Sequence, residues 1–363
     1  MRRISSHLLL TPQGLLPGRI VTVADDGRIV DIHTSRHLDG EAGVEFYSGI
    51  LIPGMVNAHC HLELSHLRGL IPSGGGFAAF VEGMKAAPRG CGVEAAEMWD
   101  ARMWSDGVQA VGDVCNGVAT FELKRRSPIR YHSFVEIFGA AANPAKAASL
   151  RDEAVGSGLR ATVTPHSLYS LSRENFIAAV NGGAEDQAAG LTENSPLSIH
   201  FMESGFEVSD PAARLVAQTP KDRPVLLVHN CTVTQRDIDI VMDHFAAPVT
   251  WVVCPASNRH ISGLTPPIEL LRKNGLRIAI GTDSLASNDT LSMVKELLLL
   301  APHTAATLEE MLGWATIGGA RALGMDDAIG SIEVGKSPGL TLLAGVDMQT
   351  LRLTEKARTQ RII

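Results

Sequence analysis

The chain has 363 residues, of which 45% are hydrophobic and 20% are charged. These proportions are typical of a folded globular protein and argue against a disordered chain. A net charge of −7 offers no basic surface for a phosphate backbone, so we expect no nucleic-acid partner. The apolar runs are shorter than the roughly 20 residues that span a bilayer, so we also expect no membrane partner.

The compartment is predicted from the first residues and from the cysteines. The start, MRRISSHLLLTPQG, has only three leucines in a row before Thr11, Pro12 and Gln13, which is too short for a signal peptide. The five cysteines are scattered, odd in number and without a C-x-x-C pair. This usage favours reduced thiols over a disulfide framework, so we expect a cytoplasmic protein.

Both ends of the chain predict β structure. Residues 18–34, GRIVTVADDGRIVDIHT, place Asp-Asp-Gly between two runs rich in valine and isoleucine, which is a hairpin signal. Residues 331–345, SIEVGKSPGLTLLAG, have a similar composition. We expect residues 1–49 and 330–363 to meet in one small β-sandwich domain.

Residues 50–329 alternate between short apolar segments and longer segments with helical periodicity, such as 172–190 and 210–219. Eight segments are predicted to be strands: 55–62, 108–116, 129–139, 159–167, 197–204, 224–230, 249–258 and 277–284. This alternation predicts an α/β protein with a (β/α)8 TIM-like barrel. A doubly wound sheet is the alternative, but the glycine cluster PSGGGFAAF lacks the dinucleotide-binding fingerprint.

Ionisable side chains stand at most of the strand ends that face a barrel's active site. His59 and His61 are two residues apart and therefore point to the same side of their strand. A third imidazole and the carboxylate of Asp283 would complete a site suited to Zn²⁺ or Fe²⁺. His166 and His200 compete for the third position, and we favour His200.

A single metal ion is expected, because none of the predicted strand ends offers a lysine that could bridge two ions. Such an ion would make hydroxide available near neutral pH. Asp283 could take the proton of the water, and His229 could orient the hydroxide. Glu203 could pass a proton to a ring nitrogen of the substrate, after which ammonia would leave.

Five segments in this order, IPGMVNAHCHLELS, HFMES, VHN, CPASNRHISG and GTDSLASN, resemble the amidohydrolase superfamily. They are most similar to its deaminase branch, which includes adenosine-type, S-adenosylhomocysteine and guanine deaminases. The resemblance covers about residues 18 to 336 and implies a (β/α)8 barrel, a β-sandwich from both ends and one catalytic metal. The metal ligands that it implies are His59, His61, His200 and Asp283. It implies Glu203 and His229 as the proton-handling pair and His166 as a substrate contact.

Within this branch, HCHLELS, FVEIFG, HSLYSLS and CPASNRHISG are most similar to the 6-aminodeoxyfutalosine deaminases of menaquinone biosynthesis. The substrate contacts that we expect are Glu63, Glu136, Asn258 and Arg259. Three of them have alternatives. Glu63 could be a surface carboxylate or the N-terminal charge of the following helix, Glu136 could pair with Arg130 or another buried cation, and Asn258 could be a loop-fixing amide. We expect Ser284 to orient Asp283 by a hydrogen bond. The segment GKSPGL departs from the family pattern G-K-x-A-D-L.

The sequence thus predicts an aminohydrolase acting on an adenine-like nucleoside, with 6-aminodeoxyfutalosine as the preferred substrate. The alternatives are a cyclic amide, guanine or pterin, or chloro-aromatic hydrolase on the same barrel. A non-catalytic scaffold is a further alternative, which the complete ligand set argues against. Zn²⁺ is expected, with Fe²⁺ as the alternative, and a homodimer is expected. The glycine-rich residues 72–84 are a candidate flap over the substrate.

Overall fold

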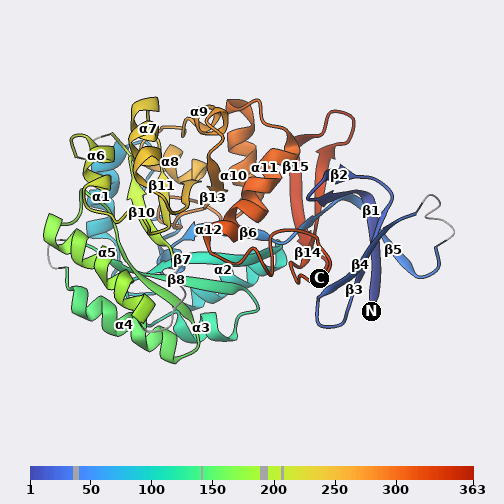
Figure 1. Cartoon of the computed structure of the whole chain (residues 1–363), viewed down its shortest axis with the longest axis horizontal. Helices are drawn as coiled ribbons and strands as arrows, with labels where there is room; N and C mark the ends of the chain where they lie inside the picture. Colours follow the sequence, from blue (N-terminus) through green and yellow to red (C-terminus); the bar gives the residue numbers. More distant parts are fainter. Residues whose placement is uncertain (36–40, 140–141, 189–194, 206–207) are drawn as a thin grey trace.

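The computed structural model describes residues 1–35, 41–139, 142–188, 195–205 and 208–363. Figure 1 shows the strands from the two termini at one end of the molecule, with the helices and the parallel strands at the other. The chain therefore divides into a terminal β part and a larger α/β part.

Eight parallel strands form two four-stranded sheets in the α/β part. The first sheet contains β6 (Met55–Cys60), β7 (Val108–Cys115), β8 (Arg130–Ile137) and β9 (Arg160–Pro165). The second contains β10 (Leu197–Phe201), β11 (Val225–His229), β12 (Val249–Val253) and β13 (Arg277–Ile280). Each of the eight segments predicted to be a strand contains one of these strands. Most of their residues are buried, as expected for parallel strands that are covered on both faces.

The two sheets share one apolar core. Val56 and Phe134 of the first sheet belong to the same buried cluster as Leu226 and Val252 of the second. Backbone hydrogen bonds also join the sheets at both of their edges. The amide of His200 donates to the carbonyl of His166 at 2.8 Å, and the amides of Thr282 and Asp283 donate to the carbonyl of His59 at 3.0 Å.

Helices alternate with these strands. The α-helices are α1 (Gly76–Ala86), α2 (Val93–Ser105), α3 (Phe121–Arg126), α4 (Pro144–Gly156), α5 (Arg173–Ala188), α6 (Pro211–Val216), α7 (Gln235–His244), α8 (Pro255–Ile261), α9 (Ile268–Lys273), α10 (Met293–Leu300), α11 (Leu308–Gly313) and α12 (Gly319–Ala322). Shorter helical turns are η2 (Leu62–Leu67), η3 (Ala301–His303) and the π-type η4 (Trp314–Gly318). The helices predicted over 172–190 and 210–219 correspond to α5 and α6, although residues 189–190 lie outside the described residues. Among the described residues, no helix is long and apolar enough to cross a membrane.

The terminal part is one seven-stranded sheet, where the sequence predicted a sandwich. Its strands are β1 (Arg2–Thr11), β2 (Gly14–Leu16), β3 (Arg19–Val23), β4 (Ile29–Thr34), β5 (Val44–Pro53), β14 (Leu340–Asp347) and β15 (Arg352–Arg361). The order β15-β14-β5-β1-β3-β4 brings both ends of the chain into one sheet, as predicted. The predicted hairpin is confirmed, since β3 and β4 pair antiparallel across a turn that ends at Gly27.

The terminal sheet needs no second sheet to cover it, because other residues already pack against each of its two faces. Ile50 and Ile52 of β5 join the large buried cluster that contains the strands and helices of the α/β part. On the other face, Leu51 and Ile4 pack with Ile332, which precedes β14. Strand β5 also crosses the predicted boundary at residue 49, so the first parallel strand follows the terminal sheet with almost no linker.

Candidate metal centre and active site

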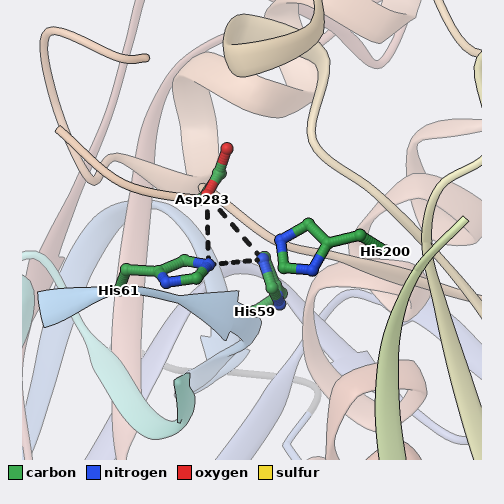
Figure 2. Close-up of side chains that lie close together, drawn as sticks. All are labelled: His59, His61, His200 and Asp283. Atoms are coloured by element: carbon green, nitrogen blue, oxygen red, sulfur yellow. Dashed lines mark hydrogen bonds and ion pairs between the residues drawn. The ribbon is translucent and has the colours of Figure 1, made fainter. Parts of the chain in front are cut away.

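Four buried side chains converge at the carboxyl ends of the parallel strands (Figure 2). His59 lies on β6, His61 directly follows it, His200 lies on β10, and Asp283 follows β13. One ligand atom from each of the four lies within 4.8 Å of the others. The structure therefore brings together the four residues that the sequence predicted as metal ligands.

The spacing of these atoms fits a tetrahedral ion. The Nε2 atoms of His59 and His61 are 3.2 Å apart, and they lie 3.7 and 3.5 Å from Oδ1 of Asp283. Donors held at about 2.1 Å from one ion at tetrahedral angles would lie about 3.4 Å apart. Burial lowers the pKa of His61 to about 3 and that of His200 well below its usual range, so both imidazoles are neutral. Neutral imidazole is the form that binds a metal.

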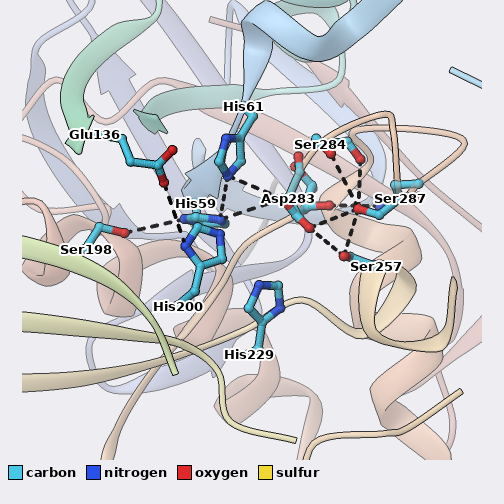
Figure 3. A network of polar contacts seen from close by, with 12 residues as sticks. His59, His61, Glu136, Ser198, His200, His229, Ser257, Asp283, Ser284 and Ser287 are labelled. Carbon is cyan, nitrogen blue, oxygen red and sulfur yellow. Dashed lines mark hydrogen bonds and ion pairs between the residues drawn. The ribbon is translucent and has the colours of Figure 1, made fainter. Parts of the chain in front are cut away.

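The second nitrogen of two of these histidines is also held in place. Nδ1 of His200 lies 3.2 Å from the carbonyl oxygen of His166. Nδ1 of His59 lies 3.5 Å from the hydroxyl of Ser198, as Figure 3 shows. Such contacts fix the ring orientation of a metal ligand and leave Nε2 for the ion.

Backbone conformation at the site is unusual for residues other than glycine. Asp283 has a φ of 57°, His229 of 84° and Asn230 of 59°. A left-handed backbone costs an ordinary residue free energy and is retained where the surrounding structure enforces it. Here two amides donate to the carbonyl of His59, and Gly281 packs so closely against His59 that a Cβ would lie 2.9 Å from its side chain. The turn after β13 is therefore set against β6, which aims Asp283 at the histidines.

The carboxylate of Asp283 is held by two serines. Its Oδ2 accepts hydrogen bonds from Ser257 at 2.5 Å and from Ser287 at 2.9 Å, which leaves Oδ1 for an ion (Figure 3). The predicted contact from Ser284 is wrong in its geometry, because the Ser284 hydroxyl lies 3.5 Å from that of Ser287 and reaches Asp283 only through it. The turn after β13 points Ser287, four residues beyond Asp283, back toward the carboxylate.

Glu203 and His229 lie beside this cluster. Nε2 of His229 is 3.6 Å from Oε1 of Glu203, and the phenol of Tyr169 donates to Oε2 of Glu203 at 2.9 Å. Burial raises the pKa of Glu203 to about 8, so its carboxyl group carries a proton at neutral pH. A buried carboxylic acid beside a metal-type cluster is suited to donate a proton.

Asn258 contacts His229, where the sequence predicted a substrate contact. Its Nδ2 lies 2.9 Å from Nδ1 of His229, and the residue is fully buried in α8. A donor at Nδ1 places the proton of a neutral imidazole on Nε2, the atom that faces Glu203. The alternative, an amide that holds a neighbouring segment in place, therefore describes Asn258 better. The residue that it holds is His229 of the site.

His166 stacks on the ring of His200, with centroids 4.2 Å apart and an interplanar angle of 13°. Its Nδ1 contacts the hydroxyls of Ser167 and Ser170, and burial lowers its pKa to about 3. His166 is only partly buried, unlike the four residues of the cluster.

Glu136 and Glu63 are connected through Asn116. Nδ2 of Asn116 donates to Oε2 of Glu136 at 3.3 Å, and its backbone amide lies 3.1 Å from both carboxyl oxygens of Glu63. Oε1 of Glu136 lies 3.9 Å from Nδ1 of His200, so Glu136 belongs to the cluster and does not pair with Arg130. Burial raises the pKa of Glu136 to about 8 and that of Glu63 to about 7.

A buried ion pair supports the segment that carries His61. Nζ of Lys124 lies 2.6 Å from Oδ2 of Asp113, and both side chains are fully buried. Oδ1 of Asp113 accepts the amide of Leu62 at 2.7 Å, directly after His61. Because a buried charge without its partner is very unfavourable, this pair fixes the start of η2 strongly.

Two further predicted features are not buried. Arg259 is exposed and makes no hydrogen bond or ion pair within the described part of the chain. The predicted flap at 72–84 largely forms α1, whose Phe77 contacts the ring of Tyr169 and whose Phe80 contacts that of His260. None of the α1 residues is buried, so α1 lies over the other residues of the site as an outer layer.

Similarity to known proteins identifies the family of the chain. A model of the amidohydrolase family matches residues 50–360. The chain therefore belongs to the amidohydrolase family, and the resemblance of its motifs is confirmed. It is a hydrolase that acts on carbon–nitrogen bonds.

Two curated relatives match most of the chain. An adenosine deaminase of Helicobacter pylori is 27% identical over 330 residues, which covers 82% of this chain and 79% of that protein. A 5-methylthioadenosine/S-adenosylhomocysteine deaminase of Moorella thermoacetica is 28% identical over 338 residues, which covers 83% of this chain and 74% of that protein.

Solved structures share the fold. Helicobacter pylori aminofutalosine deaminase in complex with methylthio-coformycin has a TM-score of 0.82 at 22% identity, covering 100% of both chains. A zinc-bound adenosine deaminase from Xanthomonas campestris has a TM-score of 0.76 at 24% identity, covering 99% of this chain and 90% of that one. A zinc complex of atrazine chlorohydrolase from Arthrobacter aurescens has a TM-score of 0.79 at 18% identity, covering 98% and 93%.

Proposed function

We propose that the protein is a metal-dependent aminohydrolase that removes the exocyclic amino group of an adenine-like nucleoside as ammonia. The observation that carries this proposal is Glu203, whose burial raises its pKa to about 8 beside the four-donor cluster. A carboxylic acid that keeps its proton at neutral pH can protonate a ring nitrogen, which a purine offers next to its amino-bearing carbon.

The residues of the site divide the reaction between them. A divalent cation supplies a water of lowered pKa, and hence a nucleophile, when it is bound. Asp283 accepts the proton of the water that adds to the ring carbon, and Glu203 gives its proton to the adjacent ring nitrogen. His229, fixed by Asn258, donates from Nε2 to the attacking oxygen. The proton on Asp283 then leaves with the amino group as ammonia, and the proton of the added hydroxyl passes to Glu203. A carbonyl thus replaces the amine, and both carboxyl groups regain their starting state.

The proposed ion is a single Zn²⁺, with Fe²⁺ as the alternative. Three imidazoles and one carboxylate suit either ion, and the zinc in two structures of similar fold favours zinc. His59, His61, His200 and Asp283 would hold it.

The preferred substrate is 6-aminodeoxyfutalosine. The segments around Glu63, Glu136 and His166 support this choice, as does the full-length likeness to the aminofutalosine deaminase of Helicobacter pylori. Because that likeness rests on 22% identity, other adenine nucleosides and the ring substrates of chlorohydrolases and guanine deaminases are the competing substrates.

We also propose that the two parallel sheets are halves of one closed (β/α)8 barrel. The hydrogen bonds at both edges and the shared core support closure. The domains predicted from the sequence are residues 50–329 for the barrel and residues 1–49 with 330–363 for the terminal β part, and their first boundary would move to the end of β5 at Pro53.

The test is a substrate panel with the zinc-loaded protein. It compares 6-aminodeoxyfutalosine, adenosine, methylthioadenosine, S-adenosylhomocysteine, guanine and atrazine by ammonia or chloride release and by the ultraviolet shift from adenine to hypoxanthine. Glu203→Gln should lower kcat on the best nucleoside by roughly 10²–10⁴-fold. Glu174→Gln, on the exposed first turn of α5, is the matched control and should leave kcat unchanged. Turnover of guanine or atrazine without any adenine nucleoside would refute the proposal.

A further inference from the structure

Glu296 is a fully buried carboxyl group with no part in the proposed reaction. It lies on α10, and this helix is held in place by Met293, Leu297 and Leu300, which belong to the large buried cluster. A buried polar group costs free energy unless hydrogen bonds compensate it. The partners of the two Glu296 oxygens therefore indicate what this side chain does.

The two oxygens of Glu296 contact two different segments of the chain. Oε2 accepts the backbone amide of Ala256, in the first turn of α8, at 2.8 Å. Oε1 accepts a hydrogen bond from Nδ2 of Asn288 at 2.9 Å, and the same nitrogen donates to the carbonyl of Thr282 at 3.0 Å. Glu296 therefore joins α8 to the turn of residues 282–288, which follows β13.

Both of these segments hold reactive side chains of the site. On α8, Ser257 contacts the carboxylate of Asp283, and Asn258 contacts His229. In the turn, Ser287 contacts the same oxygen of Asp283 (Figure 3). The hydroxyls of Ser257 and Ser287 lie only 2.8 Å apart, so both can reach that oxygen only while the two segments keep this separation. A displacement of α8 relative to the turn would therefore disturb Asp283 and His229 at once.

We propose that Glu296 is a positioning residue, which acts through α8 and the turn to hold Asp283 and His229 in place for metal binding and proton transfer. The proposal rests on the function proposed above, in which these two residues act at the metal. Glu296 must offer an acceptor to each of its two N–H donors. Carboxyl oxygens accept in either protonation state, whereas the amide nitrogen of a glutamine only donates. Glu296→Gln thus keeps the volume of the side chain and places two donors against each other at one of the contacts.

The test begins with the zinc affinity of Glu296→Gln, measured by competition with a chelator. The Kd for zinc should rise about 10–100-fold, as it does when other groups that orient a metal ligand are lost. With cobalt(II) in place of zinc, the visible absorption bands should change, because they respond to the geometry of the ligands. At saturating zinc, kcat on the best nucleoside should fall about tenfold or more while KM stays within about threefold, because the positioned groups act in the chemical step.

Asp100→Asn is the matched control. Asp100 is also a buried carboxyl group with two hydrogen bonds, from Ser127 at 2.7 Å and from Tyr131 at 2.6 Å, but it lies near the amino end of β8, away from the site. This variant should lower Tm, leave the zinc Kd within about twofold and leave the cobalt bands unchanged. A loss of zinc affinity as large as that of Glu296→Gln would indicate general loosening of the fold and would overturn the proposal.

A double-mutant cycle tests the route through α8. Ser257→Ala should raise the zinc Kd, and combining it with Glu296→Gln should raise the Kd by less than the product of the two single effects, because both remove the same support from Asp283. Single effects that multiply in full would overturn this route.

Asn288→Ala provides a second variant in case Glu296→Gln does not fold. It leaves the contact between Glu296 and Ala256 in place and removes only the connection to the turn, so it should also raise the zinc Kd and change the cobalt bands. A zinc Kd and cobalt bands like those of the wild type in either variant would refute the proposal. None of these binding measurements needs turnover, so a failure of the deaminase function would be seen separately, as a wild type that binds zinc and deaminates no nucleoside.

Discussion

Replacing Tyr169 with phenylalanine is expected to move the alkaline limit of activity to higher pH. The phenol of Tyr169 donates to Oε2 of Glu203 at 2.9 Å, and this hydrogen bond stabilises the ionised carboxylate. It therefore opposes the effect of burial, which raises the pKa of Glu203 to about 8. Without the phenol, the carboxyl group should hold its proton to a higher pH, because a contact that lowers its pKa is lost while burial and the nearby Asp283 carboxylate still raise it.

The size of this shift follows from the strength of the hydrogen bond. A hydrogen bond to a charged group contributes about 1.5–3 kcal/mol, and one pKa unit corresponds to about 1.4 kcal/mol. The pKa of Glu203 should thus rise by roughly one to two units. Because Glu203 is already protonated at neutral pH, kcat/KM at pH 7 should change little.

The assay is the pH profile of kcat/KM between pH 6 and 10 on the best nucleoside, with Tyr131→Phe as the matched control. The phenol of Tyr131 is also buried and donates to Asp100 at 2.6 Å, away from the site. An alkaline limb that stays in place or moves to lower pH in Tyr169→Phe would show that Glu203 is not the acid, or that Tyr169 does not act on it.

Further expected outcomes concern metal affinity and stability. Ser287→Ala should weaken zinc binding by about 10–100-fold in a competition titration, because it frees the Asp283 carboxylate, whereas Ser284→Ala should leave it within about twofold. Glu203→Gln should stabilise the metal-free protein. The gain in Tm should be absent at pH 4 and should grow as the pH rises from 4.5 to about 8. Over that range the Glu203 carboxyl group of the wild type ionises only in the unfolded chain. A gain that is the same at pH 4 would refute this reasoning. Lys124→Met should lower the free energy of unfolding by about 3–5 kcal/mol in urea titrations, because it leaves a buried carboxylate unpaired. A chelator should lower both activity and Tm, and Zn²⁺ should restore them.

The sequence predicted the strands well because each one carries its own local signal. A parallel strand that is buried on both faces must be a short apolar run, and turn residues or helical segments separate the runs. All eight runs contain a strand, and the four predicted ligands meet. Histidines at the ends of such runs were enough to predict the cluster, because the topology of the fold places these ends together.

The supporting residues could not be predicted in the same way. Ser257, Ser287 and Tyr169 stand in segments that the sequence marked as motifs, and Asn116 ends a predicted strand. Serine, tyrosine and asparagine are nevertheless common in loops. Their roles depend on contacts between segments far apart in the chain, such as Ser257 with Asp283 or Tyr169 with Glu203. Ser287 lies only four residues after Asp283, which was the one local signal for their contact. Ser284 lies even closer in sequence, so the sequence favoured the wrong serine.

The sequence by itself therefore determined the order of the elements, the joining of both ends in one β part, and the four side chains of the metal-type cluster. Tertiary structure decided that the terminal strands form one sheet, because Ile50 and Leu51 of β5 find partners on its opposite faces. It also decided which oxygen of Asp283 is free, that Asn258 contacts Nδ1 of His229, and that burial raises the pKa of Glu203. These are properties of distance and burial, which arise only when segments remote in the chain pack together and exclude water.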